Sequence, residues 1–568
     1  MIKLIRLKYI IASSVAAVTF LVYLPSLQNG FVNWDDNVYV YSNLFIRSFN
    51  VQLLKSAFLE FHIGHWHPLT WLSHACDYAL WGLNPLGHHL TNNILHTLNT
   101  FLVVILIIRL LEVYQEMAGP KWTSQQLMTD RTAKITAAAT GLLFGLHPLH
   151  VESVAWVSDR KDLLCAFFYL LTLITYTSYL REIRAAASIN ARSLLSNKKY
   201  LSLLTLCILA LLSKEMAVSL PFVLLILDWY PSGRIHSLKS LYTSTLEKLP
   251  FLTLAFLTSN LAIAAQQFAG AMKYGDTIPW GARVLVACKS LIVYLSKMIV
   301  PYHLVPLYPL LPPMDMQTAL LDYVIPLIMV PAITAACFVV IRKHKTWLAI
   351  WAYYVITLVP VLGLVQAGIQ AMADRYTYLP SLGPFLLIGL ASAKVYDKVT
   401  TSDQWGMALR MASVTIAMTV FVFLSYATIR QTGIWKDGVV FWNYIIDKEP
   451  EFRSTAYINL VNAYADKGML DQAIVQFQNA LSMDPDNADL HNTIGFAYLS
   501  QGQTDAAIEH FQTALRLNPD SADAHFYLGS SYLQKGSKTM AREEFELGLT
   551  LQPDNYMARQ ILSSINAE

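Results

Sequence analysis

Long apolar runs dominate the first three quarters of the chain and end near residue 430. A helix needs about 20 mostly apolar residues to cross the hydrocarbon core of a bilayer. Nine runs come close to this length, and the stretch 200–229, with Ser213-Lys214-Glu215 near its centre, is interpreted as two short spans joined by a tight turn. The pattern therefore predicts about eleven spans, at residues 9–26, 90–108, 133–151, 163–180, 200–229 (a pair), 249–267, 321–341, 347–365, 377–393 and 411–429.

Segment 283–301 is also apolar, but it contains Lys289 and Lys297 on roughly one helical face. Charges inside a span are costly, so we expect this segment to be interfacial or re-entrant. The N-terminus, segment 181–199 and segment 342–345 are all rich in Lys and Arg. Basic loops favour the cytoplasmic side, and eleven spans place all three of them there. The chain beyond residue 430 then lies on the opposite side of the membrane.

The C-terminal region shows a different pattern, because Pro485, Pro519 and Pro553 recur every 34 residues. That spacing is the period of the tetratricopeptide repeat (TPR), a pair of antiparallel helices. Small and aromatic positions recur in phase in two repeats, Gly495, Tyr498, Ala507, Phe511 and Ala514 aligning with Gly529, Tyr532, Ala541, Phe545 and Gly548. The first repeat has Val461 where glycine is usual. We predict repeats at about 454–487, 488–521 and 522–555, whose concave face would bind a peptide or protein.

Composition agrees with two regions of different class. The 568 residues are 55% hydrophobic and 14% charged, against roughly 25% charged in soluble domains. The predicted fold is all-α, with a multi-span domain at 1–430, a linker at 431–451 and a TPR domain at 452–568. The net charge of +3 gives no indication of nucleic-acid binding, and the five scattered cysteines form no disulfide or zinc pattern. No small-residue cleavage site follows the first apolar run, so we expect it to be retained as a span.

Polar residues concentrate in the loops expected outside the membrane, at about 27–89, 152–162, 213–215, 268–320 and 366–376. The first of these loops begins with the adjacent carboxylates of Asp35 and Asp36. Such a pair can act as a general base or bind a divalent cation such as Mg²⁺ or Mn²⁺. It can equally form a solvated turn or a helix cap, and composition alone favours this second interpretation.

Several acids, bases and histidines lie at the same predicted boundary. They form either a site for a phosphate and a polar substrate or a network of structural ion pairs with interfacial anchoring. His62, His65 and His67 do not follow a recognised helical metal-ligand pattern, so a polar channel is the favoured interpretation and the metal set is unknown. The candidate binding residues are Glu152, Asp159, Arg160, Lys161, Lys214, Glu215, Asp374, Arg375, His67 and His150.

The order of these motifs resembles the GT-C membrane glycosyltransferases, especially the transmembrane-and-TPR O-mannosyltransferase-like proteins and their bacterial relatives. The resemblance covers nearly the whole chain and is carried by the strings at 31–36, 67–70, 147–162, 213–215 and 373–380, followed by the repeats. Only three clear repeats are present, fewer than in many relatives with long arrays. This departure weakens the expectation of an extended binding surface for a protein acceptor.

The resemblance implies transfer of a sugar from a polyprenyl-phosphate carrier to a protein or glycan acceptor on the non-cytoplasmic face. Asp35 matches the base that removes the acceptor proton, with Asp36 supporting it. The lipid phosphate would leave toward cations, for which Arg375, Arg160, Lys161, Lys214, Lys289 and Lys297 are candidates. Glu152 and Asp159 would orient the sugar or the acceptor.

Two other classes of function are compatible with parts of the chain. A non-catalytic TPR scaffold for cell-envelope assembly accounts for the repeats but not for the charged outer loops. A transporter would place its charges near the bilayer midplane, whereas these gather at one side. The location expected is a bacterial inner membrane with periplasmic repeats, or the endoplasmic reticulum membrane in a eukaryote.

Overall fold

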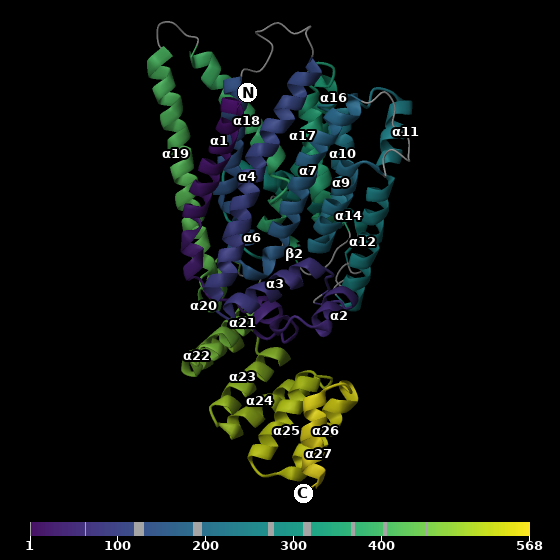
Figure 1. Cartoon of the computed structure of the whole chain (residues 1–568). Coiled ribbons are helices and arrows are strands. Elements are labelled where there is room, and N and C mark those ends of the chain that lie inside the picture. Colours follow the sequence, from purple (N-terminus) through teal and green to yellow (C-terminus); the bar gives the residue numbers. More distant parts are fainter. Residues whose placement is uncertain are drawn as a thin grey trace. The chain divides into compact units, whose positions relative to one another are not determined.

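The computed structural model describes residues 2–62, 64–118, 130–185, 196–270, 278–310, 320–364, 370–400, 406–449 and 452–567. These residues form two compact units. The first comprises Met1–Phe31 and Asp35–Lys436, and the second comprises Val32–Trp34 and Asp437–Glu568. Both units are built from helices, which confirms the predicted all-α fold class (Figure 1).

The first unit is a bundle of long helices with shorter helices at one end (Figure 1). Its two short strands, β1 (Tyr308–Pro309) and β2 (Gln370–Met372), pair antiparallel. Its helices are α1 (Ile2–Val22), α2 (Val51–Leu59), α3 (Pro68–Trp81), α4 (Pro85–Ala118), α5 (Asp130–Leu146), α6 (Val151–Ala155), α7 (Arg160–Ala185), α9 (Lys198–Ser213), α10 (Leu220–Trp229), α11 (Leu238–Glu247), α12 (Leu249–Phe268), α14 (Trp280–Ile299), α16 (Ile325–Val340), α17 (Lys345–Leu358), α18 (Leu382–Thr400) and α19 (Gly406–Thr432).

Six helices in the described part of the chain are long and apolar enough to cross a membrane, and a shorter apolar helix covers Lys345–Val361. The outermost of them, α19, exposes large apolar side chains such as Met411, Ile416 and Phe423. So large an apolar surface is stable when lipid covers it rather than water. The chain is therefore a multi-pass membrane protein, and the count of eleven spans stays a prediction.

Helix α14 covers the segment expected to be interfacial or re-entrant. Near its start, Arg283 donates to the backbone oxygen of Leu364 at 3.3 Å, and near its end Lys297 lies 3.5 Å from Asp374. Both ends thus contact the segment that follows α17. Lys289, on the same helix, pairs with Asp322 at 2.7 Å. The two lysines that argued against a span are each satisfied by an acidic partner.

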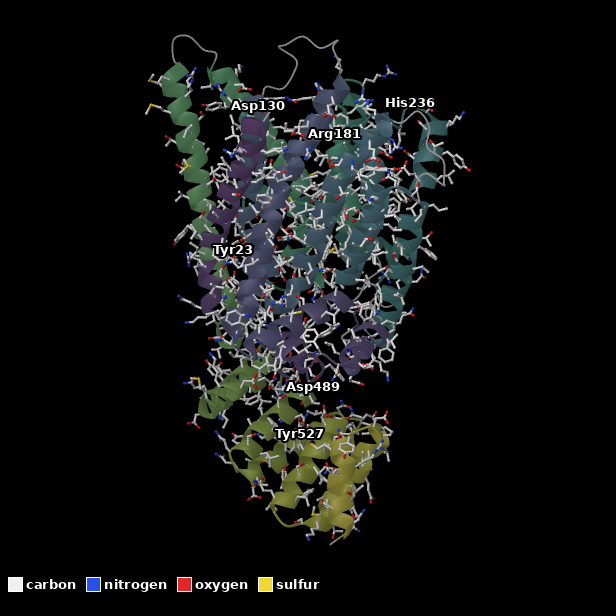
Figure 2. All side chains as sticks on the ribbon, in the orientation of Figure 1. Tyr23, Asp130, Arg181, His236, Asp489 and Tyr527 are labelled. Carbon is white, nitrogen blue, oxygen red and sulfur yellow. The ribbon has the colours of Figure 1, made fainter. Side chains whose placement is uncertain are left out.

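Helix α4 links the two ends of the bundle. Near its start, Asn92 accepts a hydrogen bond from Arg160, and near its end Glu112 pairs with Arg181. Twenty residues of α-helix separate these points by roughly 30 Å, the thickness of a bilayer core. Figure 2 places Asp130, Arg181 and His236 together at one end of the bundle. Arg160 and Arg181 therefore lie about one bilayer thickness apart.

The second unit is a stack of antiparallel helices, which confirms the predicted repeats. Residues 431–451, predicted as a linker, contain helix α20, which packs on α21, and Asn33 accepts a hydrogen bond from Trp442 of α20 at 2.9 Å. The helices are α20 (Gly438–Lys448), α21 (Arg453–Asp466), α22 (Leu470–Met483), α23 (Ala488–Ser500), α24 (Thr504–Leu517), α25 (Ala522–Gln534), α26 (Lys538–Leu551) and α27 (Tyr556–Ala567).

Glycine explains the close approach of the paired helices. A Cβ atom at Gly495 would lie 2.7 Å from the ring of Phe511, and one at Gly529 would lie 3.1 Å from the ring of Phe545. The turns between paired helices use three further glycines, Gly468, Gly502 and Gly536, with φ between +71° and +80°. These turns recur with the same 34-residue spacing as the repeats. Glycine occupies each of them because it adopts this backbone conformation without strain.

Candidate functional site

The first outer loop is a folded element with its own apolar core. Tyr39 and Val40 pack with Trp71 of α3 and with Val157, and all four are buried. Val157 begins the short turn Val157–Asp159 that precedes α7. This core therefore brings the segment after Asp36 against the start of α7, although more than 100 residues separate them in the sequence.

The two adjacent aspartates have different environments. Asp36 is buried, and its Oδ1 accepts hydrogen bonds from the backbone N–H of Ser158 at 3.0 Å and from the Ser158 hydroxyl. Asp35 is half-buried, and among the residues that the structure describes its carboxylate makes no hydrogen bond or ion pair. Asp36 thus fixes the loop to the turn before α7. The Asp35 carboxylate takes no part in this contact and is available for another partner.

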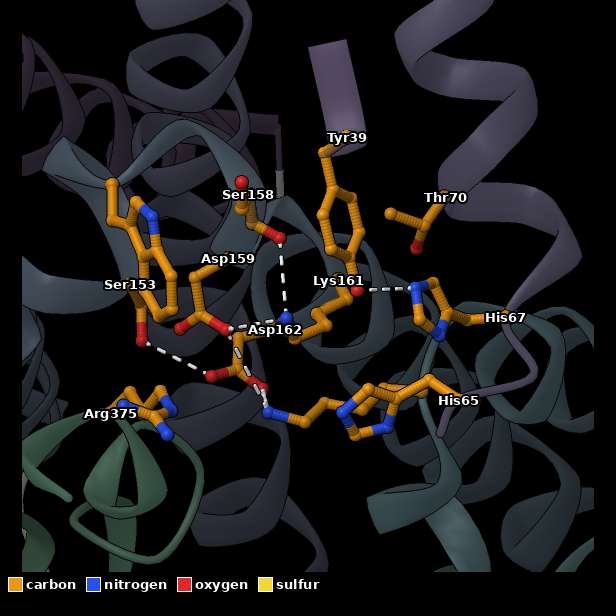
Figure 3. Close-up of polar contacts among 12 residues, drawn as sticks. Tyr39, His65, His67, Thr70, Ser153, Ser158, Asp159, Lys161, Asp162 and Arg375 are labelled. Atoms are coloured by element: carbon orange, nitrogen blue, oxygen red, sulfur yellow. Dashed lines mark hydrogen bonds and ion pairs between the residues drawn. The ribbon is translucent and has the colours of Figure 1, made fainter. Parts of the chain in front are cut away.

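A cluster of two lysines and two aspartates lies at the start of α7 (Figure 3). Lys214, which follows α9, pairs with Asp162 and lies 3.9 Å from Asp159. Lys161 lies 3.7 Å from Asp159, and its ammonium sits over the ring of Tyr39, 4.9 Å from the ring centre. All four charged side chains are at least nine-tenths buried. We call Asp159, Lys161, Asp162 and Lys214 the α7 charge cluster.

Asp159 is the incompletely satisfied member of the α7 charge cluster. Its side chain is fully buried, and apart from the Asp162 carboxyl no group in the described part of the chain donates a hydrogen bond to its carboxylate. The two lysine nitrogens lie at ion-pair distance but beyond hydrogen-bond distance. A buried carboxylate with so few donors is costly, so Asp159 is suited to accept a hydroxyl group or an N–H from a bound molecule.

A second ion pair joins α6 to the turn after β2. The backbone N–H of Arg375 donates to Glu152 at 2.9 Å, and the Arg375 guanidinium donates to the other oxygen of the same carboxylate. The guanidinium also lies over the ring of Trp156, 5.4 Å from its centre. Burial raises the pKa of Glu152 from 4.5 to about 7, and the nearby Arg375 only partly offsets this effect.

Asp374, next to Arg375, belongs to a neighbouring buried triad. The Tyr308 hydroxyl donates to Asp374 at 2.8 Å, and Lys297 lies 3.5 Å from the same carboxylate. The pairing of Tyr308 with Met372 across β1 and β2 positions the phenol for this contact. Burial raises the pKa of Asp374, whereas the charge of Lys297 lowers it. Lys297 of α14 thus lies beside the residue that precedes Arg375.

His65, His67 and Glu215 lie together at the edge of the α7 charge cluster. His65 Nδ1 is 3.1 Å from a Glu215 carboxylate oxygen, and His67 Nε2 is 2.9 Å from the Tyr39 hydroxyl. Figure 3 shows the His67 ring between Tyr39 and His65. The prediction that His67 and Glu215 belong to one site therefore has a geometric basis, although Glu215 comes from the short helical turn after α9, 148 residues further along the chain.

Two of the candidate binding residues lie elsewhere. Arg160 is fully buried, pairs with Asp77, and donates to Asn92 at 2.8 Å. His150 is held by the backbone oxygen of Phe144 at 2.7 Å and by a hydroxyl of the turn before α18 at 3.0 Å. The polar atoms of Arg160 and His150 thus bind other parts of the protein and not the α7 charge cluster.

Sequence reasoning missed three residues that complete the site. They are Tyr39, Ser158 and Asp162. Asp162 carried a usable signal, because residues three apart at a helix start share a face and Asp159 was already a candidate. Tyr39 and Ser158 carried none, since their roles come from contacts between segments distant in the sequence.

Comparisons with known protein families support the repeats. The TPR repeat family matches residues 462–502 and 495–536, and the tetratricopeptide repeat family matches 522–555. The solved structure of the first TPR of Spaghetti (RPAP3) bound to an HSP90 peptide is 24% identical to the aligned part of this chain. The match covers 20% of this chain and 90% of that chain, with a TM-score of 0.20.

Among curated proteins, the chain is similar to the protein O-mannosyl-transferases named TMTC. It is 32% identical over 221 residues to Tmtc2 of Drosophila melanogaster, covering 37% of this chain and 21% of that protein. It is 22% identical over 470 residues to Tmtc3 of Drosophila melanogaster and 23% identical over 467 residues to TMTC1 of Homo sapiens, each match covering 76% of this chain. These two matches span about half the length of the relatives, 50% and 49%.

Proposed function

We propose that the chain is a membrane glycosyltransferase that moves a sugar, with mannose the first candidate, from a polyprenyl-phosphate carrier to a protein or glycan acceptor. The observation that carries the proposal is the combination of the available Asp35 carboxylate with the α7 charge cluster. The similarity to proteins named O-mannosyl-transferases supports the same reaction class.

Each of these residues has its own role in the proposed reaction. Asp35 accepts the proton of the acceptor hydroxyl as its oxygen attacks the anomeric carbon of the sugar. The bond from that carbon to the lipid phosphate oxygen breaks, so the configuration inverts and the polyprenyl phosphate leaves. Lys161, Lys214 and Arg375 supply positive charge to the departing phosphate. Asp159 orients the sugar or the acceptor through its incompletely satisfied oxygens.

We propose that the reaction takes place on the non-cytoplasmic face of the membrane. The basic segments around Arg181 would face the cytoplasm, and the α7 charge cluster lies about one bilayer thickness away along α4. With eleven spans the repeats emerge on the same side as Asp35. We propose that they bind the protein acceptor or a partner protein, as TPR stacks do in general.

Donor-dependent thermal stabilisation of the purified chain tests the proposal. A donor at 100 times its dissociation constant should stabilise the folded state by about 2.7 kcal/mol. The panel contains polyprenyl-phosphate mannose, glucose and N-acetylglucosamine, with bare polyprenyl phosphate as the matched lipid control. The proposal expects one sugar form to raise the melting temperature more than the bare lipid does. Equal shifts for every lipid, or none, would favour a scaffold.

A further inference from the structure

Three potential metal ligands converge at the edge of the α7 charge cluster. His65, His67 and Glu215 each offer a donor atom, and all three atoms lie within 4.8 Å of one another. In the described part of the chain this is the one group of three or more such side chains. A tetrahedral ion with bonds of about 2.1 Å holds its ligand atoms roughly 3.4 Å apart. Side-chain movements that shift these ligand atoms by on the order of 1 Å would therefore bring all three to bonding distance of one ion.

The backbone presents both histidines to the same side. Reciprocal backbone hydrogen bonds of 3.1 and 2.9 Å join His62 and His65 around the turn at Gly64. The ring centres of His65 and His67 lie 5.5 Å apart. Trp66, between the two histidines, instead donates to the Phe58 backbone oxygen at 3.0 Å. His65 and His67 thus form a preorganised pair.

A separate contact fixes Glu215 opposite this pair. The Thr70 hydroxyl, in the first turn of α3, donates to the backbone oxygen of Ser213 at 3.0 Å. This bond ties the segment after His67 to the end of α9, two residues before Glu215. The three ligands therefore come from two segments that are held together independently of any ion.

One nitrogen of His67 has no partner in the described structure. The His67 side chain is fully buried, its Nε2 contacts the Tyr39 hydroxyl, and its Nδ1 has no hydrogen bond. A buried ring nitrogen without a partner is costly. Ligation through Nδ1 would satisfy it, with Nε2–H donating to Tyr39 in the manner of the outer partners of metal-bound histidines.

Local charge permits a cation at this position. Lys161 and Lys214 each face an acidic side chain, Asp159 for the first and Asp162 for the second. Glu215 then adds one negative charge beside the two imidazoles. The side chains of His65 and Glu215 are 29% and 26% exposed, which leaves an entry path for an ion.

We propose that His65, His67 and Glu215 form a site for a divalent transition metal of the zinc type, with one coordination position open toward the α7 charge cluster. Two imidazoles and one carboxylate are a ligand set of open zinc sites. Mg²⁺ and Ca²⁺ prefer oxygen ligands throughout, so they should not compete. If the proposed function holds, the open position would accept an anionic oxygen of the donor phosphate, but the metal site itself does not depend on that function.

Metal binding is measured on the full chain, purified with an affinity tag that lacks histidine and stripped with a chelator. After equilibration with zinc chloride, metal per chain is counted by mass spectrometry and affinity is obtained by competition with a chromophoric chelator. His67→Ala and Glu215→Gln remove ligands, and His62→Ala is the matched control from the same segment. His510→Ala removes a second close histidine pair, in which His491 lies at 3.0 Å.

The proposal expects one tightly bound zinc in the wild type, in His62→Ala and in His510→Ala. His67→Ala and Glu215→Gln should weaken binding by more than about 100-fold, and Tyr39→Phe, which removes the outer contact, by about 10-fold. Excess Mg²⁺ should leave the zinc in place. Absence of tight zinc, equal binding by wild type and ligand variants, or displacement by Mg²⁺ would overturn it. None of these readouts uses sugar transfer, so failure of the metal site and failure of the proposed function are distinguishable.

Discussion

Lowering the pH should stabilise the wild-type chain relative to a Glu152→Gln variant, because Glu152 is buried beside Arg375. Burial raises the pKa of Glu152 from 4.5 to about 7. Above pH 7 the wild type holds a buried carboxylate, whereas below pH 4.5 the same group is neutral in the folded and the unfolded chain. Its stabilising contribution is therefore fully present below pH 4.5 and is lost as the pH rises through 7.

The magnitude follows from the size of the shift. A shift of about 2.5 pH units at 1.36 kcal/mol per unit gives about 3 kcal/mol. The free energy of unfolding of the wild type, minus that of Glu152→Gln, should thus rise by about 3 kcal/mol between pH 8 and pH 4. Most of the change should fall between pH 7 and pH 4.5.

Chemical unfolding in mild detergent, followed by tryptophan fluorescence at several pH values, measures this difference. Glu543→Gln, which changes an exposed glutamate of α26, controls for the loss of one carboxylate. A wild-type minus Glu152→Gln difference that stays constant with pH, or that falls as the pH is lowered, would refute the reasoning. The second result would mean that Arg375 stabilises the carboxylate by more than burial destabilises it.

Two further substitutions test the packing and the ion pairs. Lys214→Met leaves the buried Asp162 without its cation and should lower the free energy of unfolding by about 3–5 kcal/mol. Adding Asp162→Asn to the same chain should restore part of this loss. Equal stability of Lys214→Met and wild type in the same unfolding assay would contradict this prediction. Gly495→Ala forces a methyl group against Phe511 and should destabilise the repeats by about 1–3 kcal/mol. Gly281→Ala is the control, because a Cβ atom at Gly281 would have no neighbouring atom within 4 Å among the described residues. Limited proteolysis of the repeats measures the difference, and equal cleavage rates for the two variants would contradict this prediction.

The repeats could be predicted from the sequence because their constraint is local and recurs. Gly495 and Phe511 belong to one helix pair, and the same contact returns at Gly529 and Phe545. The three turn glycines with positive φ carried the same period and could have been used as well. The linker prediction did not use the helical spacing of Phe441, Trp442 and Ile445, the buried residues of α20, which packs on α21.

The site could be predicted only as a set of loops at one boundary. Lys214 directly follows α9, and Arg375 lies three residues after β2. The prediction that the outer loops share one side of the membrane was enough to group them with Asp36. Arg160 shows the limit of this reasoning. It directly follows Asp159, but neighbouring helix positions point roughly 100° apart, so its guanidinium reaches Asp77 instead of the α7 charge cluster.

Pairings between distant segments account for the rest. His65 meets Glu215 because Thr70 binds Ser213, and nothing in either local sequence specifies that contact. The incompletely satisfied oxygens of Asp159 are likewise a property of the folded chain, since the same residue in an exposed turn would be hydrated.

The most direct test of the proposed function is sugar transfer by an Asp35→Asn variant. The chain is reconstituted in vesicles with the polyprenyl-phosphate sugar that stabilises it, and labelled sugar on protein acceptors is counted. Because the Asp35 carboxylate has no partner among the described residues, the variant should insert and melt like the wild type. Transfer should fall by about 10²- to 10⁴-fold, the usual contribution of a general base. Full transfer by Asp35→Asn, in a chain with unchanged stability, would contradict the account.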